Sequence, residues 1–352
     1  MKQFLNILAL CVAFTAVTAV AVVHASAQTI ITPMESQRAW TGQRVGVTDI
    51  TIEYSRPAVK GRQIWGSLVP YDEVWRAGAN ENTVFTTTHA VVVDGKTLPA
   101  GRYGVHMIPT TGAWTIIFNK ESNAWGSFFY KQSDDVLRVV VTPVAAAHQE
   151  QLTYAITDVA DDRCIVSLRW DKVDVRIPIV VDVKDAVLNH LRSQLTSLSG
   201  FNHASYTSAA AYALAHNLDR EQGKAWAERA YRGQPSYTNS MLLADYEDAL
   251  GNAAKAKELR DKGMPKATNA ELNLYGYKLL GENKVADAIV VFTENTKRFP
   301  EDANTWDSLG EAYAASGNKS KARDSFKKSL SMNPSPETKK NSEMWLKKLD
   351  GM

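Results

Sequence analysis

One long connection in the N-terminal half concentrates side chains that can bind a ligand. Residues 54–81 combine basic and aromatic side chains with several glycines and prolines, in a stretch too long for an ordinary turn. Seven of its residues are candidate ligand contacts: Arg56, Lys60, Arg62, Trp75, Arg76, Asn80 and Glu81. Guanidinium groups bind carboxylates and phosphates through paired hydrogen bonds, and aromatic rings stack on sugars or bases. The segment therefore predicts a site for a small polar or anionic ligand.

The same residues also allow two other interpretations. In a structural one, Arg76 and Glu81 form an internal ion pair, and Trp65 and Trp75 plug one end of the domain. In an enzymatic one, a hydrolase or carbohydrate-acting enzyme has its site around Arg56, Arg76, Asn80 and Glu81. Convergence of these side chains on an open pocket would favour binding or catalysis, whereas mutual pairing would favour the structural interpretation.

Recognisable catalytic motifs are otherwise missing from the sequence. There is no His-Glu-x-x-His pair, no Gly-x-Ser-x-Gly elbow and no phosphate-binding glycine-rich loop. The seven histidines are scattered and never occur in pairs at the spacing of metal ligands. We therefore expect no metal and no cofactor, and a binding protein is favoured over an enzyme.

Length, charge and cysteine content limit the classes of protein further. The chain has 352 residues, 45% hydrophobic and 22% charged, which suits about two globular domains. A formal net charge of +2 provides no basic field for nucleic acid, so no nucleic-acid partner is expected. The two cysteines, Cys11 and Cys164, exclude a disulfide-rich scaffold and a four-cysteine zinc site.

The first 27 residues have the features of a signal peptide. Lys2 precedes an almost entirely apolar run from Phe4 to Val23, and the segment ends on the small residues Ala25-Ser26-Ala27. We expect cleavage after Ala27 and export to the periplasm or beyond the cell, with no membrane span in the mature protein. An uncleaved membrane anchor is the alternative, because the apolar run is nearly long enough to span a bilayer.

From about Val45 to Val183 the sequence has the period of β-strands. Apolar and polar residues alternate in several short runs, and turn residues separate these runs without long helices between them. This predicts an antiparallel sandwich or barrel of eight or nine short strands within a domain spanning residues 28–183. Cys164 belongs to one such apolar face, so we expect a buried, unreactive thiol.

The C-terminal half contains an internal repeat. Seven residues match the spacing of a tetratricopeptide repeat: Trp306, Leu309, Gly310, Tyr313, Ala322, Phe326 and Pro334. The residues 34 positions earlier fill the same places: Leu272, Tyr275, Gly276, Leu279, Ala288, Phe292 and Pro300. The sequence predicts a linker helix over 184–203, repeats over 204–237, 238–268 (degenerate), 269–302 and 303–336, and a capping helix over 337–352.

Stacked repeats of this kind offer a groove to a partner protein. The first helix of each pair lines the inner face, so the predicted groove residues are Ser208, Tyr212, Asn273, Tyr277, Asp307 and Glu311. Tyrosines, an amide and two carboxylates suit a polar or basic segment of another protein. The alternative is that the β-domain or the lysine-rich last helix covers the groove, which makes the repeats a spacer.

Residues 54–81, together with Pro99–Tyr103, Trp114–Lys120 and Trp125-Gly126, resemble an exported bacterial family catalogued as domain of unknown function 2911. The string Trp-Arg-x-Gly-Ala-Asn-Glu at 75–81 is its most specific part, and the resemblance covers about residues 32–183. It implies a β-rich domain often followed by tetratricopeptide repeats, and it brings no established activity. His106 departs from the pattern that the resemblance leads us to expect.

These observations together favour a two-domain, non-enzymatic exported protein. Its β-domain would bind a ligand or partner, and its helical repeats would mediate an interaction with another protein. A purely structural envelope protein is the third possibility, in which both domains only make contacts.

Overall fold

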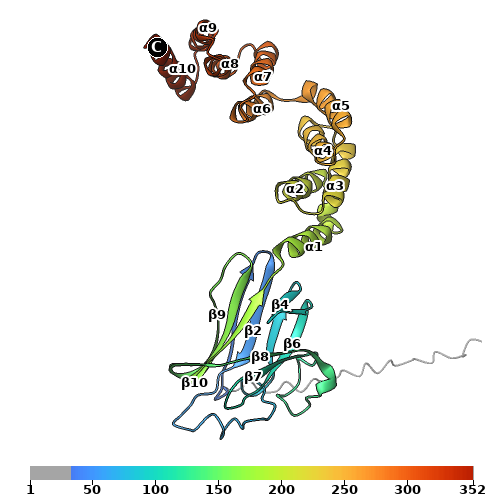
Figure 1. The fold of residues 1–352 in the computed structure, drawn as a ribbon, viewed down its shortest axis with the longest axis vertical. Helices are drawn as coiled ribbons and strands as arrows, with labels where there is room; N and C mark the ends of the chain where they lie inside the picture. The colour runs from blue at the N-terminus through green and yellow to red at the C-terminus, as the bar shows by residue number, and fades with distance from the viewer. Residues whose placement is uncertain (1–32, 352) are drawn as a thin grey trace, which may run out of the picture.

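The computed structural model describes residues 33–351, which form a β-domain followed by a helical arc (Figure 1). The expected signal peptide lies outside the described residues. Two antiparallel sheets make up the β-domain. The larger sheet has the order β1 (Arg38–Val45), β2 (Thr48–Ser55), β3 (Thr83–Thr87), β6 (Gly101–Ile108), β7 (Trp114–Asn119) and β8 (Asp135–Val141). The smaller sheet has the order β5 (Lys96–Leu98), β4 (Val91–Val93), β10 (Arg163–Val180) and β9 (Val144–Thr157).

The alternation seen in the sequence determines which face of each strand is buried. On β2, Ile50, Ile52 and Tyr54 are buried in the core between the sheets, whereas Thr51 and Glu53 are partly exposed. Apolar side chains from both sheets join one core, which also contains Cys164. Burial raises the pKa of the Cys164 thiol to about 11, so the thiol is neutral at ordinary pH, as its position on an apolar face predicted.

The strands β9 and β10 are longer than the short strands expected from the sequence. They form a hairpin of 14 and 18 residues, and its register shifts on both sides of Asp171. Asp171 has a positive φ of 51°, which bends the strand at this point. The bend interrupts the alternation of side chains, which explains why the sequence pattern suggests two shorter strands in place of one.

The helices begin directly at the end of the sandwich. Helix α1 (Val183–Leu195) starts at Asp182, whose side chain accepts a hydrogen bond from the backbone N–H of Asp185. Ala186 joins the β-domain core, while Val187 joins the core of the first helices. The two halves are therefore in direct apolar contact at α1.

Helix pairs follow α1 and the short helix η2 (Leu198–Phe201). Their members are α2 (His203–Ala215) with α3 (Arg220–Gly233), α4 (Tyr237–Ala249) with α5 (Ala253–Gly263), α6 (Asn269–Gly281) with α7 (Val285–Arg298), and α8 (Ala303–Ala315) with α9 (Lys319–Leu330). Helix α10 (Pro336–Asp350) packs on α8 and α9 and closes the array. The predicted fold class, an antiparallel β-domain followed by tetratricopeptide-like helices, is confirmed.

Glycines at equivalent places let the two helices of a pair approach closely. A Cβ on Gly276 would lie 2.5 Å from the Phe292 ring, and one on Gly310 would lie 2.7 Å from the Phe326 ring. The aromatic ring of the second helix thus occupies the space that a side chain on the first would need. This explains the Gly and Phe positions that the repeat pattern identified.

The arc is interrupted between α5 and α6. Helix α3 packs on α4, and α7 packs on α8, but α5 and α6 hardly touch. The short helix η3 (Met264–Lys266) and an extended link join them (Figure 1). Two apolar clusters meet near this link, and the one formed mainly by α6, α7 and α8 also includes Tyr237 of α4. The degenerate repeat of the sequence therefore coincides with a change in packing.

Within residues 33–351, no helix combines the length and apolarity needed to cross a membrane.

Candidate functional site

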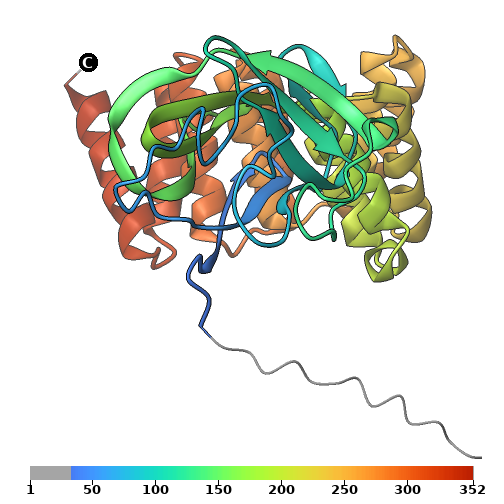
Figure 2. The ribbon, with the colours of Figure 1, turned by 90° about the horizontal axis from the view of Figure 1, so that it is seen from below.

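The connection between β2 and β3 covers the end of the sandwich that is remote from α1 (Figures 1 and 2). Its Trp65 ring lies 4.7 Å from that of Trp114 and 5.7 Å from that of Trp170, and Trp75 lies 6.0 Å from Trp170. A backbone bridge also joins Trp75 to Met107 on β6. The two tryptophans of the connection are thus part of the plug that closes the core, as the structural interpretation predicted.

Three of the predicted basic residues stabilise this connection and do not share a pocket. Arg56 donates hydrogen bonds to the Leu152 carbonyl (3.1 Å) and to the Thr153 hydroxyl (2.8 Å). Arg62 donates to two carbonyl oxygens of its own loop, and Lys60 forms an exposed ion pair with Glu35. Each side chain has a local structural partner, so a ligand is not needed to explain it.

The turn after Trp75 has an unusual backbone. Ala77 and Asn80 have positive φ values of 51° and 59°, which non-glycine residues rarely adopt. The carbonyl of Ala77 accepts hydrogen bonds from the Thr83 and Tyr154 hydroxyls, both at 3.0 Å. The Asn80 side chain donates to the Ser36 carbonyl at 3.0 Å. Strained turns held in this way are concentrated at binding and catalytic sites.

Arg76 and Glu81 do not pair with each other. Glu81 lies 4.0 Å from Arg38, whereas Arg76 donates to the Asn80 carbonyl at 2.7 Å. The Arg76 guanidinium lies against Gly126 and under the ring of Phe128, whose centroid is 5.1 Å away. Burial lowers the pKa of Arg76. The internal ion pair of the structural interpretation is therefore not formed, and among the four residues of the enzymatic interpretation the only hydrogen bond within residues 33–351 joins Arg76 to the Asn80 carbonyl.

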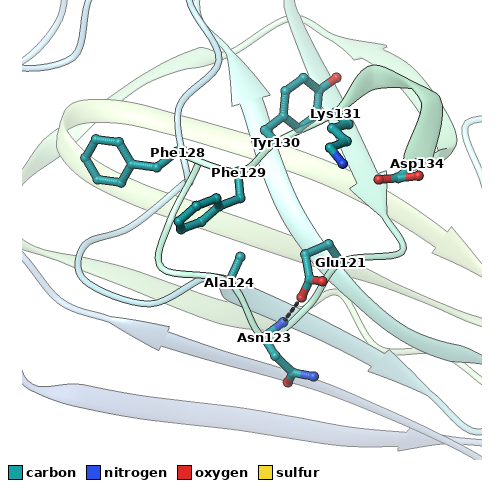
Figure 3. Close-up of a pocket in the computed structure, with 8 residues that line it drawn as sticks. All are labelled: Glu121, Asn123, Ala124, Phe128, Phe129, Tyr130, Lys131 and Asp134. Atoms are coloured by element: carbon teal, nitrogen blue, oxygen red, sulfur yellow. Dashed lines mark hydrogen bonds between the residues drawn. The ribbon is translucent and has the colours of Figure 1, made fainter.

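A second loop, between β7 and β8, faces Arg76 and contains a hollow. This hollow, which we call the aromatic bowl, has a volume of about 650 Å³ and is lined by Glu121, Ala124, Phe128, Phe129, Tyr130 and Lys131, among others (Figure 3). The loop includes the short helix η1 (Gln132–Asp134). Phe128 and Phe129 are 74% and 69% exposed. Exposed aromatic side chains in one loop mark a surface that meets another molecule.

Beside the bowl lie hydrogen-bonded polar groups, of which His106 is buried and the others are partly buried. The Nδ1 atom of His106 is 2.8 Å from the Ser127 hydroxyl. Asp135 accepts hydrogen bonds from the Tyr130 hydroxyl at 2.8 Å and from Arg138 at 2.6 Å. Burial lowers the pKa of His106 to about 4, so its imidazole is neutral at physiological pH. Such an imidazole is a weak base, and its hydrogen bond with Ser127 ties the loop between β7 and β8 to β6.

The sequence did not single out this second loop as functional. Trp125-Gly126 entered only through the family resemblance, and the aromatic run Phe128-Phe129-Tyr130 has no strand or helix period. Three consecutive aromatic residues before a lysine, in a segment without such a period, are the signal that could have revealed it. Arg76 and Asn80, by contrast, were predicted and lie beside this loop.

A larger groove lies in the helical half, at the junction of α4 and α5 with α6 and α7. We call it the central groove. It has a volume of about 990 Å³. Its apolar lining includes Met241, Leu274, Tyr275 and Val290, of which Leu274 and Val290 are 73% and 68% exposed. The interruption of packing between α5 and α6 leaves this lining uncovered.

None of the six predicted groove residues lines the central groove. Ser208 and Tyr212 face a smaller hollow of about 430 Å³ beside α1. Tyr277 donates to the Ser308 hydroxyl at 3.2 Å, and Asn273 is half-buried beside it on α6. Asp307 and Glu311 accept hydrogen bonds from Asn341 on α10, at 2.8 and 2.5 Å. These side chains lie on the first helices of their pairs, and three of them, Tyr277, Asp307 and Glu311, already form hydrogen bonds between helices.

Residues 33–351 contain no group of three or more His, Cys, Asp and Glu side chains arranged to hold a metal ion.

Comparison with known proteins identifies the two halves separately. Residues 36–179 match the family described as Protein of unknown function (DUF2911), which confirms the resemblance of the β-domain. No curated protein matches the chain.

Solved structures resemble the helical half. A structure from a functional characterization of Pseudomonas aeruginosa pilF is 21% identical, covering 43% of this chain and 71% of that one, with a TM-score of 0.30. YrrB, described as a TPR protein with an unusual peptide-binding site, is 18% identical, covering 46% and 84%, with a TM-score of 0.29. The C-terminal part of a TPR repeat-containing protein from Cytophaga hutchinsonii is 15% identical, covering 44% and 59%, with a TM-score of 0.30. At these identities the likeness concerns the fold alone.

Proposed function

We propose that this chain is an exported, non-enzymatic binding protein. Its helical half holds a segment of another protein in the central groove, and its β-domain binds a separate ligand at the end remote from α1. The observation that carries the proposal is the exposed apolar lining of the central groove. Leu274 and Val290 lie over a groove of about 990 Å³ where successive helices do not pack.

The charges around the central groove indicate what kind of segment fits it. Arg260 pairs with Asp245 at 2.9 Å and with Asp248 at 2.6 Å, and Lys257 pairs with Asp261 at 2.5 Å. The lining of the groove contains six carboxylates and four cations, so it keeps a small excess of negative charge. An amphipathic segment that combines apolar side chains with some basic ones therefore suits this groove.

The proposal is tested by a matched pair of variants. Leu274→Glu with Val290→Glu places two carboxylates in the groove at positions that are mostly exposed, so the fold should tolerate them. Leu198→Glu is the control, because Leu198 is 87% exposed and does not line the groove. We expect the double variant to lose the proteins that the wild-type chain recovers from its host, and the control to keep them. An unchanged set of partners from the folded double variant would support the spacer interpretation.

Export is the other part of the proposal, and it rests on the apolar run that ends at Ala27. Mass spectrometry of the protein purified from its native host should find Gln28 at the amino terminus. A terminus that still contains Met1 would favour the uncleaved anchor.

A further inference from the structure

We propose that Arg76, the Phe128 ring and the aromatic bowl beyond it bind a small organic oxyanion, a carboxylate or phosphate monoester that carries an apolar group. This inference rests on the ligand-binding half of the proposed function and names the class of ligand. Of the seven residues predicted to contact a ligand, the inference keeps Arg76 as the group that binds the charge. It adds the aromatic side chains of the loop between β7 and β8, which the sequence did not identify.

Among the described residues, Arg76 has no negatively charged partner. Arg102 lies 2.8 Å from Glu53, and Arg138 lies 2.6 Å from Asp135. Arg56 and Arg62 of the same connection as Arg76 each make two hydrogen bonds to uncharged oxygen atoms. Within residues 33–351, Arg76 has no ion pair with a carboxylate, and its one hydrogen bond goes to a backbone carbonyl. Its other N–H groups are left for a ligand. A partly buried cation without a counter-charge gains more from binding an anion than a solvated one does.

The guanidinium of Arg76 is held in place before any ligand binds. The Asn80 carbonyl fixes one nitrogen, and the strained turn that presents it is itself held by buried hydroxyls. On the other side the guanidinium lies against Gly126, where a Cβ would overlap its central carbon. Gly126 has a φ of 65°, so a side chain is disfavoured there on both grounds. A group ordered in advance loses less entropy on binding.

The aromatic bowl can hold the apolar part of the ligand. Phe128 covers Arg76 and also lines the aromatic bowl, so it connects the cation to the hollow. Phe128, Phe129 and Tyr130 project from one stretch of loop around the bowl (Figure 3). An oxyanion on Arg76 can therefore place its apolar body along Phe128 into the bowl.

The charges of the bowl limit the ligand to one acidic head group. Glu121 and Asp134 line the bowl together with a single cation, Lys131. A second acidic group placed in the bowl would meet two carboxylates, which disfavours polyanions. The structure therefore favours an acid with one charged end and one apolar end.

The test uses the chain from Gln28 to Met352 and isothermal titration with four probes: benzoate, phenyl phosphate, inorganic phosphate and the uncharged benzamide. We expect benzoate and phenyl phosphate to bind at least tenfold more tightly than benzamide. Arg76→Gln should weaken both by tenfold or more, and Arg76→Lys should not restore them, because an ammonium cannot donate the paired hydrogen bonds. Arg102→Gln is the matched control, and its affinities should equal those of the wild-type chain.

A second variant keeps the inference testable if Arg76→Gln fails to fold. Phe128→Ala removes an exposed ring, so it should fold normally and weaken benzoate and phenyl phosphate while leaving inorganic phosphate unchanged. Benzamide binding as tightly as benzoate would overturn the oxyanion inference but leave the ligand-binding half of the proposed function standing. Failure of all four probes to bind would overturn both. Equal affinities in the wild-type chain and a folded Arg76→Gln variant would also overturn the inference.

Discussion

Mild acid should destabilise the β-domain through one buried imidazole. His106 lies on β6 with its Nδ1 atom 2.8 Å from the Ser127 hydroxyl. Its pKa is lowered from 6.5 to about 4, mainly by burial and in smaller part by the charge of Arg76, while the charge of Asp135 opposes both. Between these two pKa values the unfolded chain binds a proton that the folded chain does not. The stability is therefore unaffected by this group above pH 6.5 and falls as the pH decreases towards 4.

The size of this effect follows from the shift itself. One pKa unit corresponds to about 1.4 kcal/mol, so a shift from 6.5 to about 4 corresponds to about 3 kcal/mol. Most of this, about 2.5 kcal/mol, is already lost at pH 4.5, where the folded imidazole is still mainly neutral. Carboxylates also titrate in this range, so the contribution of His106 has to be isolated by a variant.

His106→Gln is the appropriate variant, because an amide can keep a hydrogen bond to Ser127 and does not titrate. Urea unfolding followed by tryptophan fluorescence reports mainly on the β-domain, which contains six of the nine tryptophans, including the cluster around Trp65. Between pH 7 and pH 4.5 the wild-type chain should lose about 2.5 kcal/mol more stability than the variant. An equal loss in the two proteins would refute the assignment of a depressed pKa to His106.

Three further predictions concern the core packing of both halves. Gly310→Ala should lower the free energy of unfolding by about 1–3 kcal/mol, measured by urea titration, because the added methyl group meets Phe326. Cys164 should resist alkylation by iodoacetamide in the native chain at pH 8 and react after unfolding, as mass spectrometry can show, because its thiol is buried with a pKa of about 11. Tyr246→Phe should cost about 1–3 kcal/mol, seen as a lower melting temperature, because the buried Ala210 carbonyl loses its hydrogen bond from the Tyr246 hydroxyl at 2.7 Å.

The fold could largely be predicted because its signals are periodic. Gly310 and Phe326 recur as Gly276 and Phe292 one repeat earlier, and each pair makes the same contact. The alternation of Ile50 and Ile52 likewise gives the buried face of a strand. The length of β10 could not be predicted in this way, because the bend at Asp171 interrupts its alternation.

The candidate sites were less predictable, because they depend on contacts between distant segments. Arg76 was recognised by its type, but its position under Phe128 joins residues more than 50 positions apart in the sequence. The predicted groove residues lie outside the central groove, which is lined by second as well as first helices of the pairs. Tyr277 faces its neighbour α8, while Leu274, one turn earlier, lines the central groove. A repeat pattern cannot show where two repeats fail to pack.

The most direct test of the proposed interaction is photocrosslinking from within the central groove. A benzophenone side chain in place of Leu274 would lie among the exposed apolar residues of the groove, and the same group in place of Leu198 would lie outside it. If the helical half holds a segment of another protein, position 274 should give a crosslinked product of distinct mass in the native host, and position 198 should not. The absence of any product at position 274, or the same products from both positions, would contradict the proposal.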